Sequence, residues 1–149
     1  ELGILRYRSL EDFGGAPKKR IGSKPMMLFV GDAWQVDLDF KRLQNLLIDF
    51  YRGDPVNHVV LSGLDHLIVF TVASATGING LEKPIIHQRT YHCQLKKNPS
   101  GGKAPLPYLT SSGPDMDFMV RRTQFAAPDM WKAAMKQPVK GKPRKVKNH

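Results

Sequence analysis

A single strong amphipathic helix, set among segments with strand patterns, limits the possible fold of this chain more than any other feature. Its apolar residues recur at steps of three and four and therefore share one face: Phe40, Leu43, Leu47 and Phe50. Asp37 can cap the first turn, and Gly53 can supply the left-handed residue that follows the last turn. We therefore predict a helix between Asp37 and Gly53.

Segments on both sides of this helix are rich in the β-branched and aromatic residues that favour strands. The run Met26–Val30 is apolar and ends at Gly31, and Gly63 separates two further runs. We predict strands at residues 26–30, 58–62, 66–74, 87–95, 107–112 and 116–122. Pro128 fits the first turn of a last helix, which ends before Pro138. This order of elements predicts an α+β fold with a mixed or mostly antiparallel sheet packed by helices.

The composition is that of a folded chain of one domain. Of its 149 residues 41% are hydrophobic, and no apolar run approaches the roughly 18 residues that a membrane span needs. Cys93, the single cysteine, cannot form an internal disulfide, which suits a reducing compartment, and we expect it in the core. Because the chain begins with Glu1, we expect it to be a piece of a longer protein.

The net charge of +10, from 23 Lys and Arg against 13 Asp and Glu, is unevenly distributed. Residues 136–149 hold six Lys or Arg and no acid, and residues 83–103 hold five and no acid. Such clusters favour a phosphate backbone or an acidic partner, although a solvated basic surface is the alternative. The candidate RNA-binding residues are Arg89, Lys96, Lys97, Lys103, Arg121, Arg122, Lys132, Lys136, Lys140, Lys142, Arg144, Lys145 and Lys147.

The two adjacent arginines have different predicted environments. On a strand, Arg122 shares a face with Phe118 and Val120, whereas Arg121 faces the other way. Arg122 therefore either contacts RNA or pairs with a buried acid such as Asp117 or Asp129.

No arrangement of reactive residues predicts an enzyme or a metal site. His87 and His92 fall on opposite faces of one strand, so they cannot share an ion. Ser62, Asp65 and His66 lie within one short turn, which is too close in sequence to form a catalytic triad. The chain has neither a Gly-x-Ser-x-Gly motif nor a phosphate-binding loop. We expect a noncatalytic protein with no cofactor and no metal.

An ordered set of segments resembles the C-terminal half of the Brix-domain family. These segments are "ELGI", "GSKPMMLFVGD", "DFKRLQNLLIDFYRG", "LSGLDHLIVFT", "RTYHCQLKK" and "GPDMDFMVRRTQFAAPDMWKAAMKQPVKGKPRKVKN". The resemblance implies a lobe similar to the anticodon-binding domain of class IIa aminoacyl-tRNA synthetases. It also implies a linker at residues 1–25, the C-terminal Brix lobe at 26–137 and a basic tail, expected to be disordered, at 138–149.

The resemblance further implies a nucleolar ribosome assembly factor that binds ribosomal RNA. Its expected partners are the regulator of ribosome synthesis protein, in a heterodimer, and the N-terminal half of the Brix domain. The pair would bring 5S ribosomal RNA and its two bound ribosomal proteins to precursors of the large (60S) subunit. "VRR" at residues 120–122 matches the family's double-arginine strand, and "KPRKVKN" at 142–148 matches its basic tail, either an RNA-contacting arm or a nuclear import signal. The rival hypothesis is a protein-interaction scaffold without RNA contact by this lobe.

Overall fold

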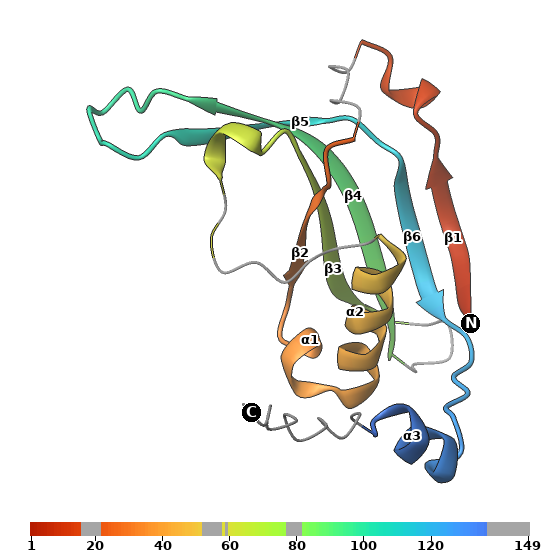
Figure 1. Ribbon diagram of the computed structural model, residues 1–149. Coiled ribbons are helices and arrows are strands. Elements are labelled where there is room, and N and C mark those ends of the chain that lie inside the picture. Colours follow the sequence, from red (N-terminus) through yellow and green to blue (C-terminus); the bar gives the residue numbers. More distant parts are fainter. Residues whose placement is uncertain (16–21, 52–57, 59, 77–81, 137–149) are drawn as a thin grey trace, which may run out of the picture.

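The structure is a computed structural model that describes residues 1–15, 22–51, 58, 60–76 and 82–136. Six strands form one sheet, and α1 and α2 pack on one of its faces (Figure 1). The strands are β1 (Leu2–Arg8), β2 (Met26–Val30), β3 (His66–Thr76), β4 (Glu82–Lys96), β5 (Leu106–Ser111) and β6 (Asp115–Val120). The helices are α1 (Ala33–Val36), α2 (Leu38–Phe50) and α3 (Pro128–Ala134), with short 3-10 turns η1 (Glu11–Phe13) and η2 (Leu61–Gly63).

The long strand β4 organises the sheet. The strand order is β1-β6-β4-β3-β2, and β5 also pairs with β4. Along one edge of β4, residues 85–88 pair with β6 and residues 91–96 pair with β5. All pairs are antiparallel except β2 with β3, whose parallel arrangement requires the crossover through α1 and α2. The predicted α+β class with a mixed sheet is confirmed.

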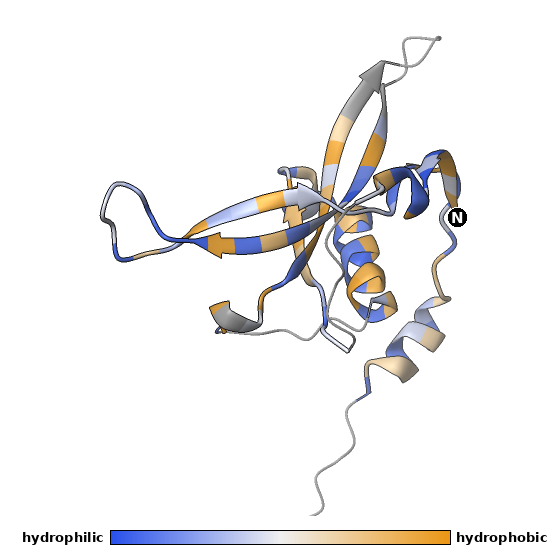
Figure 2. Ribbon diagram, turned by 90° about the horizontal axis from the view of Figure 1, so that it is seen from above, coloured by the Kyte–Doolittle hydropathy of each residue, from blue (hydrophilic) through white to orange (hydrophobic). Residues whose placement is uncertain are grey.

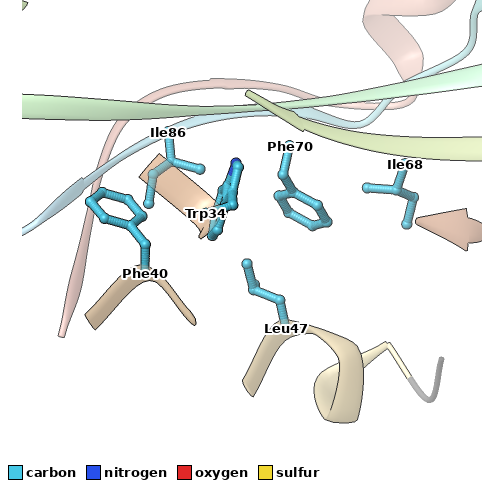
Figure 3. Close-up of a cluster of buried hydrophobic side chains, with 6 residues drawn as sticks. All are labelled: Trp34, Phe40, Leu47, Ile68, Phe70 and Ile86. Atoms are coloured by element: carbon cyan, nitrogen blue, oxygen red, sulfur yellow. The ribbon is translucent and has the colours of Figure 1, made fainter. Parts of the chain in front are cut away.

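The core lies between α1, α2 and the sheet. Figure 3 shows six of its side chains meeting there: Trp34, Phe40, Leu47, Ile68, Phe70 and Ile86. The Trp34 and Phe40 rings meet edge to face at 5.4 Å, and the Phe29 and Phe70 rings stack at 5.1 Å. Asp37 caps α2 as predicted, since its carboxylate accepts a hydrogen bond from the backbone N–H of Asp39.

The inner face of α2 ends on Tyr51, not on Phe50 as predicted. Phe50 is 74% exposed, whereas Tyr51 packs against the core. Eleven residues bring Tyr51 back to within about 20° of Phe40 around the helix axis, while ten leave Phe50 about 80° away. The Tyr51 hydroxyl donates a hydrogen bond to Gln88 Oε1 at 2.9 Å, which allows Gln88 to be buried on the same side of the sheet.

Two segments differ from the sequence-based prediction. Residues 2–8, expected within the entering linker, form β1 and pair with β6, because β6 offers an edge that β4 leaves free. Residues 58–62 were expected to form a strand, but residues 61–63 form the turn η2. Both edges of β3 are already occupied by β2 and β4, so a strand at 58–62 would have no place beside it. Gly53, the predicted helix stop, lies outside the described residues.

Candidate nucleic-acid interface

A network of charged side chains lies on the face of the sheet opposite α1 and α2, here called the charged face. Asp117 on β6 is its centre. One carboxylate oxygen of Asp117 lies 2.8 Å from Arg6 Nε on β1. The other lies 2.6 Å from Arg89 Nη2 and 2.7 Å from His87 Nδ1, both on β4. Asp115 Oδ2 lies 3.9 Å from Arg89 Nε. The network therefore joins β1, β6 and β4 across the charged face.

The pKa of Asp117 reflects a balance within this network. Burial raises the pKa of its carboxyl, but the hydrogen bonds from His87 and Arg89 and the positive charge of Arg89 outweigh burial. The pKa therefore lies below its usual value, and Asp117 is ionised at neutral pH.

Arg89, a candidate RNA-binding residue, directs most of its guanidinium N–H groups to partners within this network. Besides its carboxylate contacts, its Nη1 donates to the backbone carbonyls of Gln88 and Met116 at 2.8 and 3.0 Å. Its side chain is only 22% exposed. Since a guanidinium has five N–H donors, few remain for a phosphate. This geometry favours a structural role for Arg89.

Arg121 and Arg122 lie just past the end of β6 and point to opposite sides of the sheet. The Arg121 side chain lies across Gly3 of β1, where a Cβ atom would meet its guanidinium. Arg122 lines a groove of about 440 Å³ beside α2 and pairs with Glu1 Oε2 at 2.8 Å. The alternative in which Arg122 pairs with Asp117 does not hold, since Asp117 contacts Arg6, His87 and Arg89. Both arginines are exposed to solvent.

The remaining described candidates fall into two groups. Lys96, Lys97 and Lys103 are exposed on the β4–β5 hairpin, which projects from the body of the molecule in both views (Figures 1 and 2). Lys132 on α3 and Lys136 just after it are exposed near the end of the chain that the structure describes. The other five candidates, Lys140, Lys142, Arg144, Lys145 and Lys147, lie outside the described residues.

The described candidates therefore form two sites rather than one continuous positive surface. The arm site comprises Lys96, Lys97 and Lys103; the arginine site comprises Arg121, Arg122, Lys132 and Lys136. They lie at opposite ends of the sheet in Figure 1. Met119 pairs with Ile85, and β4 runs on to Lys96, so the two sites are up to about 35 Å apart along that strand. A ligand that contacts both must be large.

The contact between the segment that carries α3 and the helix α2 could not be predicted from the sequence. The Arg42 guanidinium lies 4.2 Å from the centre of the Phe125 ring and 5.8 Å from that of Trp131. Arg42 also pairs with Asp39 at 3.4 Å. A single basic residue on a helix has many possible partners more than eighty positions away. Only the fold brings these three side chains together.

A serine, a histidine and an aspartate meet in the structure but cannot work as a catalytic triad. Ser23 Oγ lies 3.1 Å from Asp65 Oδ2 and 3.4 Å from His66 Nδ1. His66 Nδ1 is also 2.8 Å from Asp65 Oδ1. A triad needs the serine on one ring nitrogen and the aspartate on the other, and here both meet Nδ1. The cluster instead ties the segment before β2 to the start of β3.

The described residues contain no group of three or more His, Cys, Asp and Glu side chains that could hold a metal ion. The longest described helix, α2, has 13 residues, and no described helix has the length and hydropathy needed to span a membrane.

Comparison with known proteins decides the family. The sequence matches the Brix domain over residues 1–122. The chain belongs to the Brix-domain family. It is 43% identical over 148 residues to the ribosome production factor 2 homolog of Mus musculus and 41% identical to that of Homo sapiens. The corresponding protein of Schizosaccharomyces pombe is 34% identical. These matches cover 99% of this chain.

The same matches cover only 44–46% of the relatives. This Brix-domain chain therefore spans less than half the length of the curated relatives that it matches. The family predicted from the ordered segments is confirmed. The family match ends at Arg122, whereas the similarity to the relatives continues through α3.

Proposed function

We propose that this Brix-domain chain serves ribosome production as a noncatalytic assembly factor that binds ribosomal RNA. The proposal rests on the exposure of basic side chains at two sites of the described lobe. Asp115 and Asp117 are buried and paired within the sheet, while the lysines and arginines of the arm site and the arginine site are exposed. Exposed acids lie close to the arginine site, since Glu1 pairs with Arg122 and Asp129 is exposed on α3. A polyanion meets an acid-free stretch of chain at the arm site, because no Asp or Glu occurs between Lys83 and Pro114. The relatives are named ribosome production factor 2 homolog, which supports a role in the same process.

We propose that the chain acts in the nucleolus as a heterodimer with the regulator of ribosome synthesis protein. Together they bring 5S ribosomal RNA and its two bound ribosomal proteins to precursors of the large subunit. The resemblance of the sequence motifs to the family supports this proposal. Exposed apolar side chains also offer a surface on which a protein partner could pack. Leu46 and Phe50 on α2 are 62% and 74% exposed, and Met130 on α3 is 67% exposed.

The exposed apolar side chains also favour the rival function, a scaffold that binds only proteins. Substitution at the arginine site separates the two. We expect Arg121→Ala to weaken binding to 5S ribosomal RNA and to an unrelated RNA duplex alike, and to lower the salt slope by about 1, because one phosphate contact is lost. Lys41→Ala is the matched control, since Lys41 is an exposed cation on α2 outside both sites.

The measurement is RNA affinity by fluorescence anisotropy over a range of salt concentrations. If Arg121→Ala and Arg122→Ala leave RNA affinity at the wild-type value while the affinity for the partner protein falls, the scaffold function is correct. A loss that is equally large in Lys41→Ala would also contradict a specific arginine site.

A further inference from the structure

The β4–β5 hairpin carries an exposed aromatic ring beside its lysines. Six register pairs, from Tyr91 with Ser111 to Lys96 with Leu106, hold the two strands together. Tyr108 lies opposite Gln94, and the strand alternation places it on the same face as Lys96. The hairpin projects from the rest of the molecule (Figure 2), and this face is exposed at its outer end, at Gln94, Lys96, Leu106 and Tyr108.

Tyr108 and Lys96 are in direct contact. The Lys96 Nζ lies 3.8 Å from the centre of the Tyr108 ring, a cation–π arrangement. Tyr108 is nevertheless 53% exposed. A ring with that much exposed area, on a strand that projects into solvent, contributes little to the core. The neighbouring Leu106, 47% exposed, continues the apolar surface on the same face.

No acidic residue interrupts this hairpin. The sequence from Lys83 to Pro114 contains no Asp or Glu, while Lys96, Lys97 and Lys103 all lie on the arm or its connecting loop. An acidic protein segment would pair with the charge and could use the ring only as apolar contact area. A nucleotide uses both features, because its base has a flat π-face and its phosphate is an anion.

We propose that Tyr108 and Lys96 form a binding site for an unpaired nucleotide of RNA. The base stacks on the Tyr108 ring, and the Lys96 ammonium moves from the ring to the phosphate, joined by Lys97 and Lys103. The inference rests on the proposed RNA-binding function and narrows it: the arm site takes single-stranded or looped RNA, whereas a continuous duplex hides its base faces.

The test compares a short unstructured RNA oligonucleotide of about 10 nucleotides with an RNA duplex of the same length. Both are titrated against the chain and its variants by fluorescence anisotropy. We expect Tyr108→Leu to weaken binding of the oligonucleotide roughly 5- to 100-fold, the usual loss for one stacked base, and to leave duplex binding unchanged. Tyr108→Phe keeps the ring and should bind as the wild type does.

Tyr7→Leu is the matched control. Tyr7 lies on the edge strand β1, at the other side of the sheet, and is 59% exposed. Its replacement removes a tyrosine of similar exposure and should not change the affinity for either RNA. Thermal melting shows whether each variant folds. If Tyr108→Leu does not fold, Tyr108→Trp replaces it, and the larger ring should bind the oligonucleotide at least as tightly as tyrosine does.

The outcomes separate this site from the general function. If the wild type binds neither RNA, the proposed RNA-binding function fails and the nucleotide site fails with it. If the wild type binds the oligonucleotide and Tyr108→Leu binds it equally well, only the nucleotide site is wrong. Equal losses for the oligonucleotide and the duplex would also overturn it. So would loss of a protein partner from Tyr108→Leu with oligonucleotide affinity intact, because the hairpin would then be a protein-binding arm.

Discussion

Asp117 shows how single residues of this lobe combine segments that are far apart in the sequence. It lies on β6, and its carboxylate contacts Arg6 on β1 and both His87 and Arg89 on β4. Each of these residues, read alone, is an ordinary charged or polar position of a strand. The network could not be predicted from the sequence, because it depends on the order of three strands and on their register.

Replacement of Asp117 should reveal what the network contributes to stability. We expect Asp117→Asn to lower the free energy of unfolding at pH 7 by about 2–3 kcal/mol, since charge-assisted hydrogen bonds are lost and Arg89 keeps a buried charge. Because the pKa of Asp117 is lowered in the folded state, its stabilisation is complete above the unfolded value near pH 4 and is lost as the pH falls through the lower, folded value.

Urea unfolding of the wild type and Asp117→Asn at several pH values measures this difference. The two curves should approach each other as the medium becomes more acidic than about pH 4. Asp49→Asn, at an exposed position of α2, is the control and should change stability by less than about 0.5 kcal/mol. A difference between wild type and Asp117→Asn that stays constant down to strongly acidic pH would contradict the assigned ionisation.

At the scale of elements, hydrophobic periodicity and helix capping correctly predicted the elements that depend on neighbouring residues. The apolar run Met26–Val30 is β2, and the helix capped by Asp37 is α2. The prediction was wrong for segments whose structure depends on pairing with distant strands. The segment Leu2–Arg8 becomes a strand because β6 has a free edge, and the segment before Leu64 turns because β3 has none. The polar residues Gln88 and Thr90 of β4 are buried on the face that packs against the helices. Their burial also depends on tertiary structure.

The two phenylalanines of α2 provide a direct test of its orientation. Phe40 is 7% exposed and packs against Trp34, whereas Phe50 is 74% exposed. We expect Phe40→Ala to lower the free energy of unfolding by about 3–5 kcal/mol, because it leaves a cavity in the core. Phe50→Ala should change it by less than about 0.5 kcal/mol. Chemical denaturation of both variants measures this. A larger loss in Phe50→Ala would mean that α2 is rotated about its axis.

At the scale of the whole molecule, the exposed candidate RNA-binding residues are divided between two ends of the sheet. The sequence showed the basic clusters but not their separation, because their relative positions depend on which half of β4 pairs with β5 and which with β6. It also indicated Arg89 as an RNA-binding residue, because residues 83–103 are basic and contain no acid. The fold supplies an acidic partner from β6.

The basic segment 138–149 adds five Lys or Arg to this distribution. If it contacts phosphate, a chain cut after Gln137 should lose up to about 4–5 from the slope of log affinity against log salt. We expect a clear reduction in this slope when the cut and intact chains are compared. An unchanged slope would assign RNA binding to the folded lobe and leave the segment as an import signal.

The binding of 5S ribosomal RNA to this chain at increasing salt tests directly whether the chain recognises phosphate. Phosphate contacts release counterions, so about 6–10 such contacts would lower the affinity by roughly 10³–10⁵ between about 50 and 200 mM salt. We expect a steep loss of this kind. An affinity that does not change with salt would contradict this expectation.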